Sequence, residues 1–426
     1  MSQETGYVIY YALFFIWLFV NSLYNKTNRI VSYINLLWAI SAASAAIMHI
    51  LLPWMDPNIK LLPFVYLQLC FLIYMLPIYK FSENCWTNIN VSNPTFLKYF
   101  ILVISIIAIL PLFENVKHLL QTYISGDYSE LAEIYNAKME SSSSAHQISD
   151  AWLSPLGKIL NKPINYLYYS FPFFLFYYLT RPKLNKWVLG GIVAVITCKL
   201  SFELNMAGRM EVAYFLFDSV LLFVLFRKHF PEERRRKIQR AGIVLFTGFI
   251  LLFSIMTIAR QANAKENDKV SNAVFATYYI ARPHLSFNSD MWNIKQHTQG
   301  DNSFSFYKYI TGFHTIIDNF ERREYWGPSR IGIPSHIFYT FFGDWFMDLG
   351  IIGTLLLTVL FSLLGKKITI NKGNNISLFA LYFFFIYCSI ILRGWTFFSF
   401  KSFWASLLII VNCLILYLIS SVKLKK

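Results

Sequence analysis

Residues 197–219, TCKLSFELNMAGRMEVAYFLFDS, carry charged side chains inside a region that is otherwise apolar enough to lie in a membrane. The charged residues are Lys199, Glu203, Arg209, Glu211 and Asp218. The apolar stretches on either side of the central turn can each cross a hydrocarbon layer of about 30 Å, because a helix rises about 1.5 Å per residue. Lipid offers the backbone no hydrogen-bond partner, so the stretch predicts two membrane helices joined by a short polar turn.

The same pattern recurs along the whole chain. Of its 426 residues, 56% are hydrophobic and only 14% are charged, which is far from the composition of soluble domains. We therefore expect an all-α integral membrane protein that forms a single polytopic domain over residues 1–426. The apolar runs predict about eleven transmembrane helices, near 7–23, 30–52, 61–79, 97–113, 164–179, 187–204, 210–226, 242–259, 337–361, 376–392 and 398–420.

Lysine and arginine are concentrated in every second connection between these spans. Short loops rich in Lys and Arg stay in the cytoplasm, so the N-terminus is expected outside and the C-terminus inside. The long loops 114–163 and 260–336 then lie on the external face, and both contain stretches with helical spacing. The basic run RKHFPEERRRKIQR, residues 227–240, is interpreted as an anchor beside anionic lipid, so no nucleic acid is expected as a partner.

Most charged residues in the predicted spans fall in their external halves. Lys199 and Glu203 lie one helical turn apart, as do Asp344 and Asp348. A charge at bilayer depth costs about 3 kcal/mol, so these groups must pair or face water. We predict a polar cavity that opens to the external side under the two long loops. Two alternatives with purely structural roles stay open. Lys199 and Glu203 neutralise each other, and the aspartates form ion pairs with Lys199, Arg393 or Lys401.

The chain lacks the sequence motifs of nucleotide and metal chemistry. It has no P-loop, GxSxG, HExxH or Gly-rich dinucleotide turn, and its five cysteines form no CxxC pair. No cofactor and no metal are therefore expected. Arginines in the external loops instead suit an anionic substrate, since guanidinium binds phosphate oxygens in a fork. A lipid-linked sugar diphosphate fits both the membrane and the charge.

Two segments carry a resemblance to a known family. NMAGRMEVAYFLFDSVLLF, residues 205–223, resembles the small-residue and arginine turn that opens a helix in bacterial O-antigen polymerases. GIPSHIFYTFFGDWFMDLGIIGTLL, residues 332–356, resembles their later segment, in which an external loop re-enters the membrane before an acidic residue and a GxxG. Related O-antigen ligases share this layout but have Asn after the histidine, whereas Ile337 follows His336 here, which favours a polymerase.

The resemblance implies a GT-C-like glycosyltransferase of the bacterial inner membrane. Its donor and acceptor would be undecaprenyl-diphosphate-linked oligosaccharides, with a chain-length regulator as a further protein partner. Arg209 would hold the diphosphate, His336 would act as base or as a donor to the diphosphate, and Asp348 would act as base or orient the acceptor. Further substrate contacts are expected from the other charged residues of the cavity and its loops, namely Lys199, Glu203, Arg282, Arg322, Arg323, Arg330, Asp344 and Arg393.

Plain structural roles compete with each of these assignments. Arg209 would simply anchor a turn, His336 would be an interface histidine, and some loop arginines would be surface charges. Two other functions also need a polar cavity or external loops: a transporter of lipid-linked oligosaccharide, and a scaffold for other assembly proteins. Trp292, Tyr325 and Trp326 are candidates for stacking on sugar rings.

Overall fold

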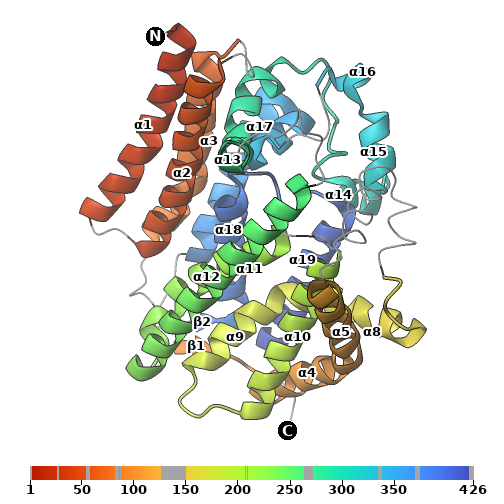
Figure 1. Ribbon diagram of the computed structural model, residues 1–426. Coiled ribbons are helices and arrows are strands. Elements are labelled where there is room, and N and C mark those ends of the chain that lie inside the picture. The colour runs from red at the N-terminus through yellow and green to blue at the C-terminus, as the bar shows by residue number, and fades with distance from the viewer. Residues whose placement is uncertain are drawn as a thin grey trace. The chain divides into compact units, whose positions relative to one another are not determined.

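The computed structural model describes residues 2–25, 28–53, 58–81, 86, 88–125, 150–206, 208, 210–262, 272–333, 338–369 and 375–421. Helices form most of this part of the chain (Figure 1). The residues group into two compact units by their internal contacts. Unit 1 consists of Met1–Trp86, Val270–Asn375 and Phe383–Leu407, and unit 2 consists of Thr87–Lys269, Ile376–Tyr382 and Leu408–Lys426.

Unit 1 begins with three long helices and adds the helices of the second long loop. Its elements are α1 (Gln3–Tyr24), α2 (Arg29–Leu51), α3 (Leu61–Lys80), α13 (Asn272–Ser289), the 3-10 turn η5 (Met291–Asn293), α14 (Ser305–Ile310), α15 (Asn319–Tyr325), α16 (Pro328–Ile331) and α17 (Thr340–Thr369). The expectation of helices in the loop 260–336 thus agrees with the structure. Residues 334–337, including His336, lie outside the described residues.

Unit 2 holds the middle of the chain. Its helices are α4 (Pro94–Ile107), α5 (Ile109–Ser125), α8 (Pro155–Leu167), α9 (Phe171–Thr180), α10 (Lys186–Asn205), α11 (Met210–Phe226) and α12 (Glu232–Ala262), with 3-10 turns η2 (Tyr168–Ser170) and η3 (Arg227–His229). Strands β1 (Asn88–Asn90) and β2 (Asn375–Ser377) pair in a small sheet that the sequence did not predict. The helices α18 (Leu378–Arg393) and α19 (Phe403–Ser421) contribute residues to both units.

Several helices are long and apolar enough to cross a membrane, as a multi-pass membrane protein requires. Within the described ranges there are six: Gln3–Tyr24, Arg29–Leu51, Leu61–Lys80, Lys186–Asn205, Thr340–Ile368 and Phe403–Ser420. A seventh is counted if α4 and α5, bent by 46°, form one span. The predicted spans 164–179 and 376–392 correspond to shorter helices, since α9 has 10 residues and α18 has 16. Membrane-spanning character is therefore clear, while the number eleven stays a prediction.

Small side chains let the helices of unit 1 approach closely. The buried face of α2 carries Ser41, Ala42, Ala45 and Ala46, and α1 and α13 both pack along this helix. Small residues favour close helix packing in membranes, where apolar burial alone gives little driving force. About one turn before Ser41 on the same helix, the fully buried Trp38 packs among aromatic rings of other helices.

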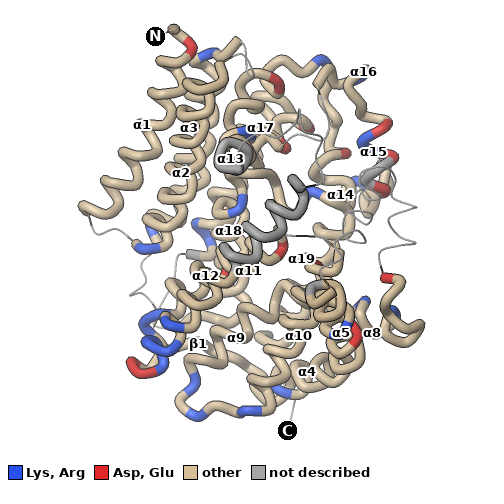
Figure 2. Tube along the Cα trace, viewed as in Figure 1, with Lys and Arg blue, Asp and Glu red and all other residues tan. Residues whose placement is uncertain are grey.

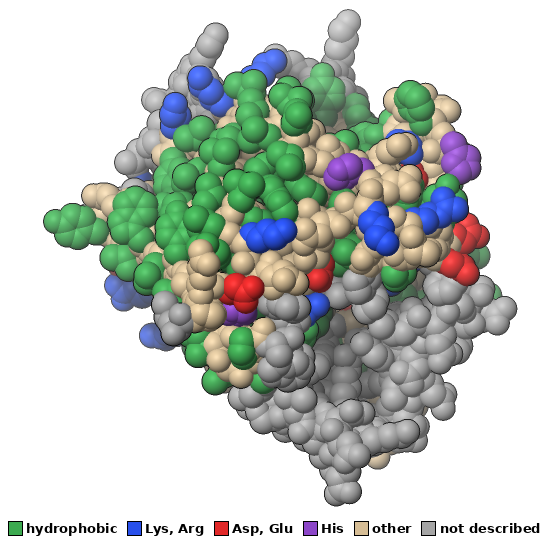
Figure 3. Space-filling model, turned by 90° about the horizontal axis from the view of Figure 1, so that it is seen from above, with side chains coloured by type: hydrophobic (Ala, Val, Ile, Leu, Met, Phe, Trp, Pro, Cys, Tyr) green, Lys and Arg blue, Asp and Glu red, His purple; other side chains and the backbone are tan. Residues whose placement is uncertain are grey.

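Large apolar side chains remain exposed on the membrane-type helices. Leu13 and Trp17 of α1 are 58% and 60% exposed, and Ile352 of α17 is 75% exposed. On the face that Figure 3 shows, hydrophobic side chains cover much of the described part, and charged side chains lie in small separate groups. Such an exterior suits contact with lipid. By contrast, Lys and Arg gather at the first turns of α12 (Figure 2).

Candidate functional site

The first turns of α17 place two carboxylates on one buried face. Asp344 and Asp348 are 1% and 2% exposed, and residues four apart share a face of a helix. The helix start is fixed by the turn after α18, because its first two amides donate to the carbonyls of Gly394 and Thr396, both at 2.9 Å. The two carboxylates are therefore presented by an element whose position is set at its first residue.

Asp348 fastens a polar loop, residues 297–303, onto α17. Its Oδ1 accepts hydrogen bonds from Thr298 Oγ1 at 2.5 Å and from Asn302 N at 2.9 Å. Its Oδ2 accepts from Ser303 N at 2.8 Å. Several donors to one ionised carboxylate offset much of the cost of burying its charge.

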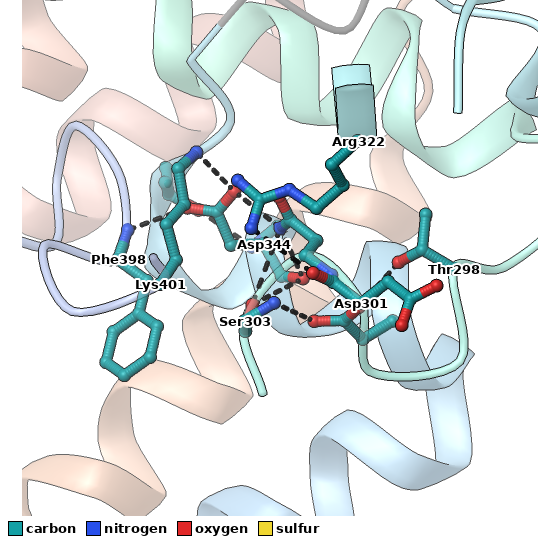
Figure 4. Close-up of polar contacts among 11 residues, drawn as sticks. Thr298, Asp301, Ser303, Arg322, Asp344, Phe398 and Lys401 are labelled. Carbon is teal, nitrogen blue, oxygen red and sulfur yellow. Dashed lines mark hydrogen bonds and ion pairs between the residues drawn. The ribbon is translucent and has the colours of Figure 1, made fainter. Parts of the chain in front are cut away.

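Asp344 fastens a second segment, the turn that follows α18. Its Oδ2 accepts from Phe398 N at 2.7 Å, and its Oδ1 accepts from Lys401 Nζ at 3.0 Å (Figure 4). Asn302 Nδ2 also donates to Oδ1, at 3.1 Å, so Asn302 bridges the two aspartates. Of the ion-pair partners that the sequence left open for Asp344, Lys401 is thus the one that it contacts.

The 297–303 loop contacts α17 at the point where that helix is interrupted. Gly350 has φ 67° and ψ −167°, a conformation that is essentially restricted to glycine. Carbonyls just before the break receive hydrogen bonds from the loop: His297 Nδ1 lies 3.1 Å from Phe346 O, and Thr298 N donates to Met347 O at 2.9 Å. The loop therefore replaces helical bonds that the break removes.

Three cations face three buried carboxylates in this part of unit 1. Lys401 pairs with Asp344, and Lys308 Nζ lies 2.5 Å from Asp301 Oδ1. Arg322, 6% exposed, reaches from α15 toward the carboxylates and donates from Nη1 to the carbonyl of Asp301 at 3.3 Å (Figure 4). Burial lowers the pKa of Arg322, and the surrounding carboxylates, with Asp348 the strongest of them, oppose that shift. Formal charges therefore balance within this charge cluster.

A cavity of about 130 Å³ borders the charge cluster. Its polar lining comes from Thr298, Asn302, Arg322, Arg323 and Lys401, and Trp326 closes part of the wall. Arg323 is exposed and, among the described residues, has no carboxylate within ion-pair distance. Since the other cations are already balanced, Arg323 leaves the cavity with an excess positive charge, and an anion would be attracted to it.

The structure brings together only some of the residues predicted from the sequence. Asp344, Asp348, Arg322 and Arg323 meet around the cavity. Arg209 and His336 lie outside the described residues, so their roles stay predictions.

The remaining predicted residues are engaged elsewhere. Arg282 donates to Tyr278 Oη at 2.6 Å and lies 3.5 Å from Asp290, while the Arg330 guanidinium stacks 3.8 Å above the Tyr325 ring. In unit 2, Lys199 Nζ lies 2.5 Å from Glu203 Oε1, which is the mutual neutralisation that the sequence left open. Arg393 is 4% exposed near the end of α18, with its guanidinium 5.9 Å from the centre of the Phe400 ring.

Sequence reasoning missed the loop that holds the aspartates. Thr298, Asn302 and Ser303 bind mainly through a hydroxyl and backbone amides, which no spacing rule detects. The sequence offered one signal, because the run TQGDNS, residues 298–303, is rich in turn formers. In the structure, Gln299 and Gly300 of this run adopt φ 52° and 91°. Consecutive left-handed residues let the chain fold its amides toward a single carboxylate.

Comparison of the chain with protein-family models, with curated proteins and with solved structures found no match.

Proposed function

We propose that the protein is a glycosyltransferase of the bacterial inner membrane that polymerises undecaprenyl-diphosphate-linked oligosaccharide repeat units at the external face. The observation that carries this proposal is the cation-lined cavity beside the buried aspartates of α17. The proposal includes about eleven spans in a GT-C-like arrangement, with the N-terminus outside. It rests on the resemblance of residues 205–223 and 332–356 to O-antigen polymerases and on the chemistry of the cavity.

The cavity suits a diphosphate better than a sugar. Arg322 and Arg323 present guanidinium groups, which bind phosphate oxygens in a fork, and Lys401 adds an ammonium group. Its volume of about 130 Å³ is well below the ~300 Å³ at which pockets begin to enclose larger organic ligands. The diphosphate would therefore enter the cavity, and the oligosaccharide would extend along the external loops.

The proposed reaction transfers a glycan from one lipid carrier to the sugar on another. An acceptor hydroxyl attacks the anomeric carbon of the donor, a new C–O bond forms, and the bond from that carbon to the diphosphate oxygen breaks. The bonding electrons leave with undecaprenyl diphosphate, whose negative charge is stabilised by Arg322 and Arg323. The hydroxyl proton passes to a base, for which His336 is the candidate. The glycosyl bond to diphosphate supplies the driving force, so no nucleotide is consumed.

The direct test uses purified protein and lipid-linked repeat units without added nucleotide. Wild-type protein is expected to form a ladder of polymer lengths. Arg323→Gln should lower the rate at least tenfold, because it removes the excess charge of the cavity. Arg330→Gln is the matched control, since Arg330 has the same charge in the same loop but stacks on Tyr325 outside the cavity. No polymer from wild-type protein, or equal rates for the two variants, would contradict the proposal.

A transporter remains the second candidate because of one observation, the break of α17 at Gly350. Broken helices that meet polar loops are common at the binding sites of secondary transporters. The two functions differ in vesicles loaded with lipid-linked repeat units. A transporter would move the units across the bilayer without joining them, whereas the polymerase would lengthen them on one side.

A further inference from the structure

Asp301 binds three separate segments of unit 1 through its side chain. Its Oδ1 accepts from Lys308 Nζ of α14 at 2.5 Å and from Thr315 Oγ1 at 3.0 Å. Its Oδ2 accepts from Trp326 Nε1, directly after α15, at 3.0 Å. The residue is 6% exposed, so these bonds are shielded from water. Asp301 therefore joins α14, the segment after α14 and the end of α15.

The main chain of Asp301 adds a fourth tie. Its carbonyl accepts the bond from Arg322 Nη1 at 3.3 Å, and its amide donates to Thr298 O at 3.0 Å. Asp301 thus contacts both Arg322, in the middle of α15, and Trp326, directly after its end, and both residues line the cavity. A helix of seven residues is too short to be stable alone, so its place depends on such contacts.

Asp301 itself is held in place by α17. It lies in the 297–303 loop, and that loop is fastened by Asp348 through Thr298, Asn302 and Ser303. A continuous series of hydrogen bonds therefore runs from the buried helix to α15. Trp326 Nε1 and Lys308 Nζ are the groups at the far end that would lose their acceptor if the carboxylate were removed.

We infer that Asp301 is a positioning residue of the cavity, which orients Arg322 and Trp326 so that their groups can meet a bound anion. Asp301 does not line the cavity, and it acts through the residues that do. Only the identity of the anion, a diphosphate, rests on the proposed function. The placement of α15 by Asp301 stands on the hydrogen bonds alone, so the two can be tested separately.

The first measurement reports on Trp326 without any ligand. Full-length protein labelled with 5-fluorotryptophan gives ¹⁹F signals from 11 tryptophans, and Trp326→Phe assigns the signal of Trp326. Asp301→Asn should shift or broaden that signal, because the anionic acceptor of the indole N–H is lost. Glu324→Gln is the matched control, since Glu324 is an exposed carboxylate of α15, and it should leave the signal unmoved.

The second measurement is the affinity of the same proteins for inorganic pyrophosphate. Asp301→Asn should weaken binding at least tenfold, and Glu324→Gln should leave it within twofold of wild type. A second variant, Asp301→Asn with Lys308→Met, removes both members of the buried ion pair and so recovers thermal stability. Binding should remain weak in that variant, because Trp326 still lacks its anionic acceptor and α15, which carries Arg322, has lost that tie. If Asp301→Asn alone does not fold, the double variant provides both readouts.

The outcomes separate the two ideas. A wild-type affinity and an unmoved Trp326 signal in Asp301→Asn would overturn the positioning role and leave the proposed function intact. Recovery of binding by Lys308→Met would also overturn it, since Asp301 would then only neutralise Lys308. Failure of wild-type protein to bind pyrophosphate, together with a shifted Trp326 signal in Asp301→Asn, would remove the diphosphate site and uphold the positioning role.

Discussion

At the scale of single residues, the two aspartates of α17 have different surroundings. Both oxygens of Asp348 accept hydrogen bonds, from Thr298, Asn302 and Ser303, and the residue is 2% exposed. Asp344 instead contacts Lys401, whose ammonium group also lines the cavity. Donors occupy both oxygens of each carboxylate, and what sets Asp344 apart is its contact with a cation that lines the cavity. The geometry thus favours a loop-holding role for Asp348 and a role near the ligand for Asp344.

Asp348→Asn should destabilise the protein strongly. The amide replaces one acceptor oxygen by a donor, which then faces a hydroxyl or a backbone N–H. Loss of a buried charged acceptor typically costs about 3–5 kcal/mol, whereas a single hydrogen bond to a charged group is worth about 1.5–3 kcal/mol. Thr298→Val removes only one donor and keeps the shape, so it should lower the melting temperature in detergent by less. Equal melting temperatures for wild type and Asp348→Asn would show that the carboxylate does not hold the loop.

The sequence could predict the aspartates but not their partners. Asp344 and Asp348 are visible as charges four residues apart in an apolar run. Three of the hydrogen bonds to them come from backbone amides, those of Asn302, Ser303 and Phe398, which lie 46, 45 and 54 residues away in the chain. Every residue type except proline has that donor. Likewise, Arg322 and Arg323 are adjacent and identical in type. Arg322 is buried and Arg323 is exposed, and this difference depends on which face of α15 packs against the protein.

At the scale of elements, α17 combines a membrane-type helix with an interruption at a polar site. Hydropathy predicted its apolar length well, because lipid exposure selects for continuous apolar residues. It did not predict the break, since glycine is common inside transmembrane helices without any change of direction. The break becomes visible only with the loop that supplies bonds to the carbonyls of Phe346 and Met347.

Gly350→Ala should be markedly less stable than wild type. The φ of 67° and ψ of −167° are unfavourable for alanine, and an added Cβ would lie 2.8 Å from His297 Nε2. Backbone strain of this kind costs about 1–3 kcal/mol, and displacing His297 would add to it. Gly242→Ala is the matched control: Gly242 lies in the helix α12 with nothing within 4 Å of an added Cβ. There alanine should be neutral or slightly stabilising, by up to about 1 kcal/mol.

Thermal unfolding of both glycine variants in the same detergent checks this difference. The pattern is specific, because Gly350→Ala should lose stability while Gly242→Ala keeps it. A Gly350→Ala protein as stable as wild type would mean that α17 runs through position 350 as a regular helix in solution. The bonds from His297 and Thr298 to this helix would then need another explanation.

At the scale of the whole molecule, the distribution of charge decides which segments of the protein face the cytoplasm and which face the outside. Composition alone predicted a helical, multi-pass chain. A protein with so few charged residues cannot cover its surface with polar groups, so much of that surface must face lipid. The number of spans was harder to predict, because α9 and α18 are short and α12 starts with a basic, exposed segment. Orientation depends on such basic segments: Arg236 of α12 is 69% exposed and should lie in the cytoplasm.

Cysteine labelling in intact cells tests that orientation at two exposed positions. In a variant without the five native cysteines, Glu321→Cys on α15 should react with a membrane-impermeant maleimide from outside. Arg236→Cys should react only after the cells are permeabilised. The reason is electrostatic, since clustered Lys and Arg are retained on the cytoplasmic side, and the long loop 260–336 is predicted to lie on the other side. The reverse labelling pattern would put the cation-lined cavity in the cytosol. Lipid-linked repeat units destined for the external face could not reach the cavity there. That result would therefore contradict polymerisation outside.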